Sequence, residues 1–89
     1  MHSKILIICE YKNLFEILNE IAESLNFKIL YCDKKGYDEI KFDPNINYLT
    51  ISQKKIDGIN NPLILSELPL KLEKILEKIN INFLKNKFI

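Results

Sequence analysis

The chain has 89 residues, enough for one domain and too few for two. An apolar fraction of 47% favours a packed globule, and a balance of 13 basic to 12 acidic residues excludes a general electrostatic attraction to nucleic acid or acidic membranes. All the basic residues are lysines. Since arginine is the usual bidentate reader of phosphate and guanine, this composition argues against DNA recognition by the segment itself.

The cellular setting that the sequence predicts is the cytoplasm. No apolar run approaches the roughly 18 residues that a membrane-spanning helix needs. The first residues lead straight into a strand pattern, without the apolar region and cleavage site of a signal peptide. The two cysteines are therefore expected to be reduced thiols, and no membrane contact is expected.

The first element is the nearly unbroken apolar run from Lys4 to Glu10, in which isoleucine dominates. Such a run is typical of a strand that is buried on both faces, as central strands of parallel sheets are. A helix pattern follows, so the run ends at the carboxyl edge of a sheet, where ligands bind in open α/β folds. Cys9, Glu10 and the turn after them are thus the first candidates for a site.

The following elements alternate between helix and strand. Apolar residues at helical spacing predict a helix that starts at Asn13 or Lys12 and ends at Asn26, with Asn13 as the better N-cap. Strands are expected over residues 27–32 and 47–52, and residues 62–65 are expected to form a short extended piece. Ser66 is expected to cap a last helix with Glu67 in its first turn. The pattern predicts a parallel sheet with the first strand central and helices on both faces.

The division of the chain is predicted near residue 80. Residues 1–80 are expected to form the domain, and residues 81–89 to be either an extension of the last helix or a tail that leads into a linker. The apolar end of the sequence favours a domain that belongs to a longer protein.

Cys9 is the strongest candidate for a reactive side chain. A thiolate at a strand end that faces a helix could act as a nucleophile, as in small phosphatases and phosphocysteine carriers. Such sites need a loop that cradles phosphate, but residues 10–15 contain no Gly, Ser, Thr or Arg, and Glu10 would repel a phosphate. A buried structural cysteine is the simpler interpretation. The same holds for Cys32, and a redox pair requires neighbouring strand ends to bring the two thiols together.

The remaining polar candidates have ordinary interpretations beside the functional ones. Glu10 and Asp33 near neighbouring strand ends could hold Mg²⁺, or be solvated turn acids. His2 is a single histidine without an evident metal partner. The lysine pairs are expected to be solvated loop charges, with phosphate or partner contact as the alternative; they are Lys34 with Lys35 and Lys54 with Lys55.

Taken together, the two ends of the sequence resemble the receiver domain of bacterial response regulators. Lys4 to Ile8 match its first strand, and Glu10 stands at its Mg²⁺-binding acidic pair, with Cys9 replacing the other acid. The passage from Asn61 to Leu68 resembles the closing Lys-Pro segment, with Asn61 in place of the switch lysine and Pro62 in place of the proline. Ser52 is the candidate for the family's Thr or Ser at a strand end.

The resemblance implies a shortened and degenerate receiver, because the third strand ends in Ser52 and Gln53, without a phosphoacceptor aspartate. It implies a truncated flavodoxin-like fold and the N-terminal domain of a winged-helix transcriptional regulator, with DNA bound only through a separate downstream domain. We expect no catalysis, no phosphoacceptor, no metal and no cofactor. The expected action is homodimerisation or binding of a protein partner. Candidate interface residues are Leu63, Leu65, Pro69 and Leu70.

Two alternatives remain open at this point. One is a small phosphocysteine or thiol carrier, or a phosphatase-like protein, that uses Cys9. The other is an adaptor that binds another protein and never dimerises.

Overall fold

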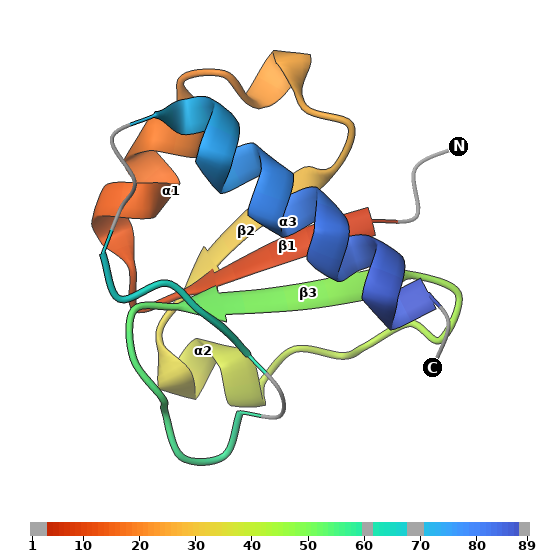
Figure 1. Ribbon diagram of the computed structural model, residues 1–89. Helices are drawn as coiled ribbons and strands as arrows, with labels where there is room; N and C mark the ends of the chain where they lie inside the picture. The colour runs from red at the N-terminus through yellow and green to blue at the C-terminus, as the bar shows by residue number, and fades with distance from the viewer. Residues whose placement is uncertain (1–3, 60–61, 68–70, 88–89) are drawn as a thin grey trace.

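The computed structural model describes residues 4–59, 62–67 and 71–87. The chain folds into a compact α/β domain built on a four-stranded, all-parallel sheet (Figure 1). The elements in chain order are β1 (Lys4–Cys9), α1 (Lys12–Asn19), the 3₁₀ helix η1 (Ala22–Ser24), β2 (Lys28–Cys32), α2 (Lys34–Asp38), β3 (Asn47–Ser52), β4 (Leu63–Ile64) and α3 (Leu72–Lys87).

Strand β1 is central, as the apolar run predicts. The strand order is β2-β1-β3-β4, so β1 pairs with β2 on one side and with β3 on the other. Its residues 6–9 are completely inaccessible to solvent, since both faces of this strand are covered. The isoleucine-rich sequence is accounted for by this double burial, because a strand with one wet face would alternate apolar and polar residues.

One face of the sheet carries both long helices. Helices α1 and α3 pack against the side chains of Leu6 and Ile8 from β1 and of Leu49 and Ile51 from β3. Figure 1 shows α3 crossing in front of the strands, with α1 beside it. The buried residues that the two helices contribute to this core are Leu14, Leu18, Ile75, Ile79 and Phe83.

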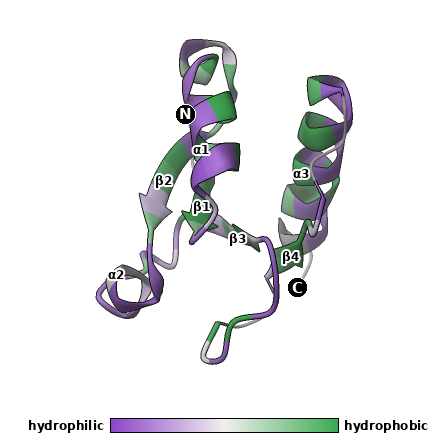
Figure 2. Ribbon diagram, turned by 90° about the vertical axis from the view of Figure 1, so that its left-hand side faces the viewer, coloured by the Kyte–Doolittle hydropathy of each residue, from purple (hydrophilic) through white to green (hydrophobic). Residues whose placement is uncertain are grey.

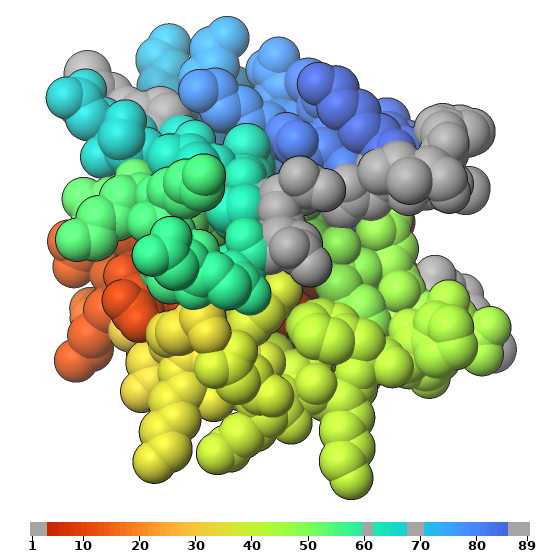
Figure 3. All heavy atoms as spheres, turned by 90° about the horizontal axis from the view of Figure 1, so that it is seen from below, coloured from red at the N-terminus to blue at the C-terminus, as the bar shows by residue number. Residues whose placement is uncertain are grey.

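The opposite face is covered by shorter segments. Tyr48 of β3 is paired with Ile5 and so points to this face, where its ring meets Phe42 at 4.8 Å, and Phe42 meets Tyr37 of α2 at 5.8 Å. Figure 3 views the molecule from below, where α2, the segment after it and the loop after β3 form most of the surface. Helix α2 is almost wholly hydrophilic (Figure 2), in keeping with its sequence of Lys34 to Asp38.

The first helix is shorter than expected. It begins at Lys12, the earlier of the two expected starts, with Tyr11 and not Asn13 at the N-cap, and it ends at Asn19 instead of Asn26. The chain then tightens into 3₁₀ turns, with Ile21 N–H bonded to Leu18 O at 3.1 Å. Ile21 and Leu25 still reach the core from these turns, which satisfies the apolar spacing that had suggested a longer helix.

The last helix begins later than expected, and it has the extension past residue 80 that was one of the two expectations. Ser66 is not its N-cap: the N–H of Leu65 bonds to Ser52 O at 3.0 Å, so the chain is still leaving the sheet there, and the described helix α3 begins at Leu72. It continues past residue 80 to Lys87. Phe83 is buried in the core, so residues 81–83 belong to the folded domain and not to a separate tail.

Candidate functional site at the carboxyl edge of the sheet

The candidate site lies where the strand order reverses. From β1 the chain goes to β2 on one side, then crosses to β3 on the other, so β1 and β3 flank the switch point at which open parallel sheets bind ligands. The strands end here in Cys9, Cys32 and Ser52, and the turns that follow begin with Glu10, Asp33 and Gln53.

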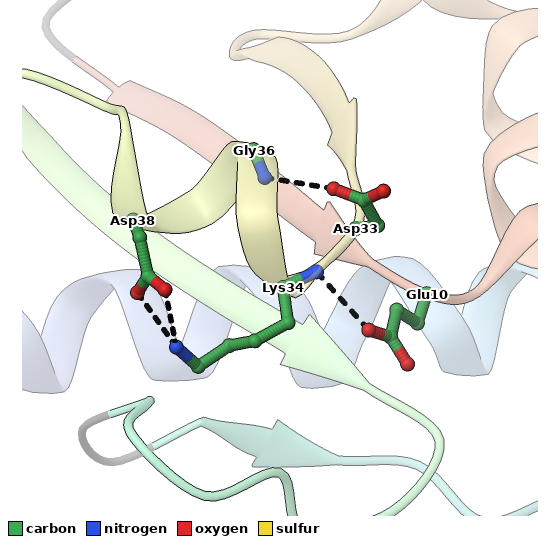
Figure 4. Close-up of polar contacts among 5 residues, drawn as sticks. All are labelled: Glu10, Asp33, Lys34, Gly36 and Asp38. Atoms are coloured by element: carbon green, nitrogen blue, oxygen red, sulfur yellow. Dashed lines mark hydrogen bonds and ion pairs between the residues drawn. The ribbon is translucent and has the colours of Figure 1, made fainter.

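Glu10 makes a sharp turn directly after β1. Its φ of 52° lies in the left-handed region, which costs a side-chain-bearing residue energy unless its surroundings hold it there. Two hydrogen bonds hold it: its N–H donates to Cys32 O at 2.9 Å, and its carboxylate accepts from the N–H of Lys34 at 3.0 Å (Figure 4). The Glu10 carboxylate is therefore turned toward the start of α2.

Asp33 and Lys34 complete this corner. The Asp33 carboxylate caps α2 by accepting from the N–H of Gly36 at 2.7 Å. The ammonium of Lys34 lies 2.6 Å from the carboxylate of Asp38, one turn further along the helix, as Figure 4 shows. The two strand-end acids of the proposed magnesium site are thus both bonded to backbone amides of α2 in this structure. Among the described residues, no three His, Cys, Asp or Glu are grouped to hold a metal ion.

Cys9 is completely buried at the end of β1. Burial raises the pKa of its thiol to about 12, with further contributions from Cys32 and from the charges of Glu10 and Asp33. The reactive form of a cysteine is the thiolate, so a buried thiol with a raised pKa is a poor nucleophile. This geometry weighs against a phosphocysteine carrier or a phosphatase that uses Cys9.

Cys32 lies directly beside Cys9. The two residues are partners in the register of β1 and β2, and both thiols are free. Burial also raises the pKa of the Cys32 thiol. A redox pair requires the ends of β1 and β2 to be neighbours, and in the structure they are.

Ser52 ends β3 with its side chain completely buried. Its hydroxyl donates to the backbone carbonyl of Lys54 at 2.8 Å, so it closes the turn after the strand. Pro62 is half-buried immediately before β4. Asn61, which the resemblance to receivers would put in place of the switch lysine, lies outside the described residues, as does His2.

The candidate interface residues separate into three groups. Leu65 is only 5% exposed and belongs to the core, so it does not offer a surface for docking. Leu63 is half-buried against that core. Pro69 and Leu70 lie outside the described residues. Leu65 follows β4 directly and packs into the core, where its carbonyl accepts a hydrogen bond from the Tyr11 hydroxyl at 2.8 Å.

Other apolar side chains are exposed, and the interface prediction missed them. On α3, Ile81 is 44% and Leu84 58% exposed. They are three residues apart and lie on the side of the helix away from Ile79 and Phe83. The sequence carried a signal for this pair, because the apolar residues after position 80 continue at helical spacing on two sides of the helix.

The lysine pairs are distributed over the surface. Lys34 is half-buried and paired with Asp38, whereas Lys35, Lys54 and Lys55 are exposed. The arrangement matches the solvated charges that the sequence suggested more closely than a convergent phosphate site.

Comparison of the chain with protein-family models, with curated proteins and with solved structures finds no significant match. In the described part of the chain, no helix combines the length and the apolar character needed to cross a bilayer.

Proposed function

We propose that this chain is a degenerate, phosphorylation-independent receiver-like domain of a transcriptional response regulator, and that it acts by self-association. The observation that carries the proposal is the apolar pair Ile81 and Leu84, exposed on the outer side of α3 while the inner side of the same helix is buried in the core. An exposed apolar pair on a helix is the kind of surface that a second copy of the same helix can cover in a two-fold dimer.

The topology supports the receiver-like, flavodoxin-like part of the proposal. The strand order β2-β1-β3-β4 agrees with the first four positions of the flavodoxin-like order. A truncated fold of this type would have α1 and α3 on one face and α2 as the helix of the other. The connection between β3 and β4, residues 53–62, is where a full-length doubly wound fold would have a crossover helix.

The switch point supports the phosphorylation-independent part. The acid that follows β1, Glu10, is bonded to the N–H of Lys34, and the Lys34 ammonium is bonded to Asp38. The polar side chain at the end of β3, Ser52, is buried and closes its own turn. In this arrangement the chain's own groups satisfy one another at the position where a receiver would bind Mg²⁺ and phosphate.

The chemistry of the proposed action is therefore association without a catalytic step. A two-fold dimer would place two copies of a downstream domain for paired DNA half-sites, so DNA contact would be made by that domain and not by this one. A pair of side chains is small beside the about 800 Å² that each partner buries in a standard stable interface, so we expect weak, concentration-dependent association.

The test is the mass of the chain in solution, measured by sedimentation over a range of concentrations, with and without acetyl phosphate and Mg²⁺. We expect a dimer at high concentration whose population does not respond to the phosphodonor. Leu84→Lys should shift the chain to monomer, because it places a charge in the apolar contact. Gln53→Lys adds the same charge at an exposed position in the loop after β3 and should leave the dimer intact.

Three results would refute the proposal in different ways. A monomer at every concentration would favour an adaptor that binds another protein. A dimer that persists in Leu84→Lys would remove the outer side of α3 as the interface. Dimerisation only with acetyl phosphate and Mg²⁺ would show a working phosphoacceptor, and the degenerate reading would fail.

A further inference from the structure

The two cysteines occupy directly opposed positions on neighbouring strands. Cys9 of β1 and Cys32 of β2 are register partners in a parallel pair, and such partners project their side chains to the same face. Neighbouring strands lie about 4.8 Å apart, which is within the roughly 4.4–6.8 Å that separates the Cα atoms of disulfide-bonded cysteines. The strand spacing therefore satisfies the Cα separation that a disulfide between these two residues requires.

The two thiols are close enough for each to affect the pKa of the other, and burial raises the pKa of both. Cys9 is inaccessible to solvent, whereas Cys32 is half-buried. Cys32 is thus the thiol that a small reagent can approach first, and Cys9 is positioned behind it to react second.

We propose that Cys9 and Cys32 form an oxidisable dithiol at the carboxyl edge of the sheet, and that its reagent is a small-molecule disulfide. Deprotonated Cys32 attacks one sulfur of the reagent, breaks its S–S bond and releases one small thiolate, which takes up a proton. Cys9 then loses its proton and attacks the Cys32 sulfur, which releases the second small thiol. The protein loses two electrons and two protons, and the reagent gains both.

The surroundings of the pair connect it to the rest of the edge. The carbonyl of Cys32 accepts the hydrogen bond of the Glu10 N–H. A Cβ at Gly36 would lie 3.2 Å from the Cβ of Cys32, so α2 passes closely over this residue. Oxidation would draw the two side chains together beneath α2, at the corner where Glu10 holds Lys34. The modification is independent of whether the chain self-associates.

The test is equilibration of the full chain with a thiol and its disulfide, such as reduced and oxidised glutathione, over a series of ratios. Acid quenching, alkylation of the free thiols and mass spectrometry then count the thiols. The chain contains only two cysteines, so an intramolecular disulfide in a monomer identifies the pair without mapping. We expect a single transition from two free thiols to none, at a ratio that does not change with protein concentration.

Two alanine variants distinguish the thiol that reacts first from the thiol that reacts second. Cys9→Ala should stop at the mixed disulfide on Cys32, whereas Cys32→Ala should react at least about tenfold more slowly, because its only thiol is inaccessible. In urea, formation of the same disulfide should need a ratio of oxidised to reduced glutathione that is higher by about tenfold or more. The reason is that an unfolded loop of about 23 residues holds the thiols at a lower effective concentration. A persistent mixed disulfide in the unmodified chain, a disulfide-linked dimer, or equal behaviour in native buffer and in urea would each overturn the proposal.

Discussion

The side chain of Lys34 lies against Gly58: a Cβ built at position 58 would be 2.8 Å from the Lys34 Cε and 2.9 Å from its Nζ. Lys34 begins α2 beyond β2, and Gly58 lies in the loop after β3, so this contact reaches across the end of β1 from one neighbouring strand to the other. The backbone N–H of the same lysine donates to the Glu10 carboxylate, and its ammonium pairs with the Asp38 carboxylate, which places one residue at the centre of the carboxyl edge.

Gly58→Ala should destabilise the domain for two reasons. Gly58 has φ of 90°, which an L side chain rarely adopts, and the added Cβ would force the end of the Lys34 side chain to shift from its place beside Asp38. We expect a loss of about 1–3 kcal/mol in the free energy of unfolding, measured by urea denaturation.

A double-mutant cycle separates these two reasons. In Lys34→Ala/Gly58→Ala no lysine side chain has to shift and only the backbone cost remains, so the second substitution should cost less in the lysine-free background. Equal costs in both backgrounds would show that Lys34 does not restrict position 58.

Tyr11→Phe should remove a buried hydrogen bond that joins the start of α1 to the end of β4. The Tyr11 hydroxyl donates to the carbonyl of Leu65 at 2.8 Å, and both residues are in the core. Loss of the donor leaves a buried carbonyl without this partner, so we expect about 1–2 kcal/mol less stability. Tyr31→Phe is the matched control, since Tyr31 is 39% exposed, and it should stay within about 0.5 kcal/mol of the unmodified chain.

Phe83→Ala should be far more damaging than Leu84→Ala. Phe83 is 2% exposed, its ring lies 5.4 Å from that of Phe27, and its carbonyl accepts a hydrogen bond from the Asn47 side chain at 2.9 Å. Removal of a buried phenylalanine side chain typically costs about 3–5 kcal/mol, enough to unfold a marginal domain. Leu84 is 58% exposed, and its truncation should change the stability of the monomer by no more than about 0.5 kcal/mol.

That comparison also tests the boundary near residue 80. Circular dichroism and urea denaturation at a concentration where the chain is monomeric would give both values. If the two alanine variants were equally stable, residues after 80 would not be part of the cooperative fold.

The free energy of unfolding should decrease in alkaline solution, because the folded chain keeps buried cysteine and tyrosine side chains protonated. The unfolded chain releases the Cys9 proton near its ordinary pKa of 9.0, while burial raises the folded-state pKa to about 12. Between these values the unfolded state binds fewer protons, so the free energy of unfolding decreases as pH rises, by up to about 1.4 kcal/mol per pH unit for this one group. Burial raises the pKa of Tyr11 and of Cys32 as well, which acts in the same direction.

Urea denaturation of the reduced chain at a series of pH values from about 8 to 11 would measure this slope. Cys9→Ala should have a shallower slope over the same range, whatever its stability near neutral pH. A slope unchanged by the substitution would mean that the Cys9 thiol titrates alike in the folded and unfolded states.

The sequence predicted the sheet better than the helices. Strand β3 has the bounds that the apolar run 47–52 predicted, and β1 is the central strand, because double burial leaves an unbroken apolar run that few other structures require. The end of α1 was missed because Ile21 and Leu25 reach the core equally well from 3₁₀ turns, so apolar spacing does not distinguish the two.

The candidate site was only partly accessible to sequence reasoning. The strand ends at Cys9, Cys32 and Ser52 followed from local patterns, because parallel strands end at one edge. The contacts of Lys34 did not, since its partners Glu10 and Gly58 are 24 residues away on either side of it. Such contacts depend on the direction that each turn takes in the folded chain. That direction cannot be read from residue types and their spacing.

The packing of Phe83 also constrains how the domain can be synthesised and folded. Lys4 at the start of β1 lies with its ammonium 5.9 Å from the ring centroid of Phe83, near the end of the last helix. Strand β1 therefore emerges from the ribosome long before the residue that covers it. Until α3 has been made, the apolar side chains of β1 and β3 on that face are not covered. They are therefore exposed to non-native contacts until the residues of α3 have left the ribosome.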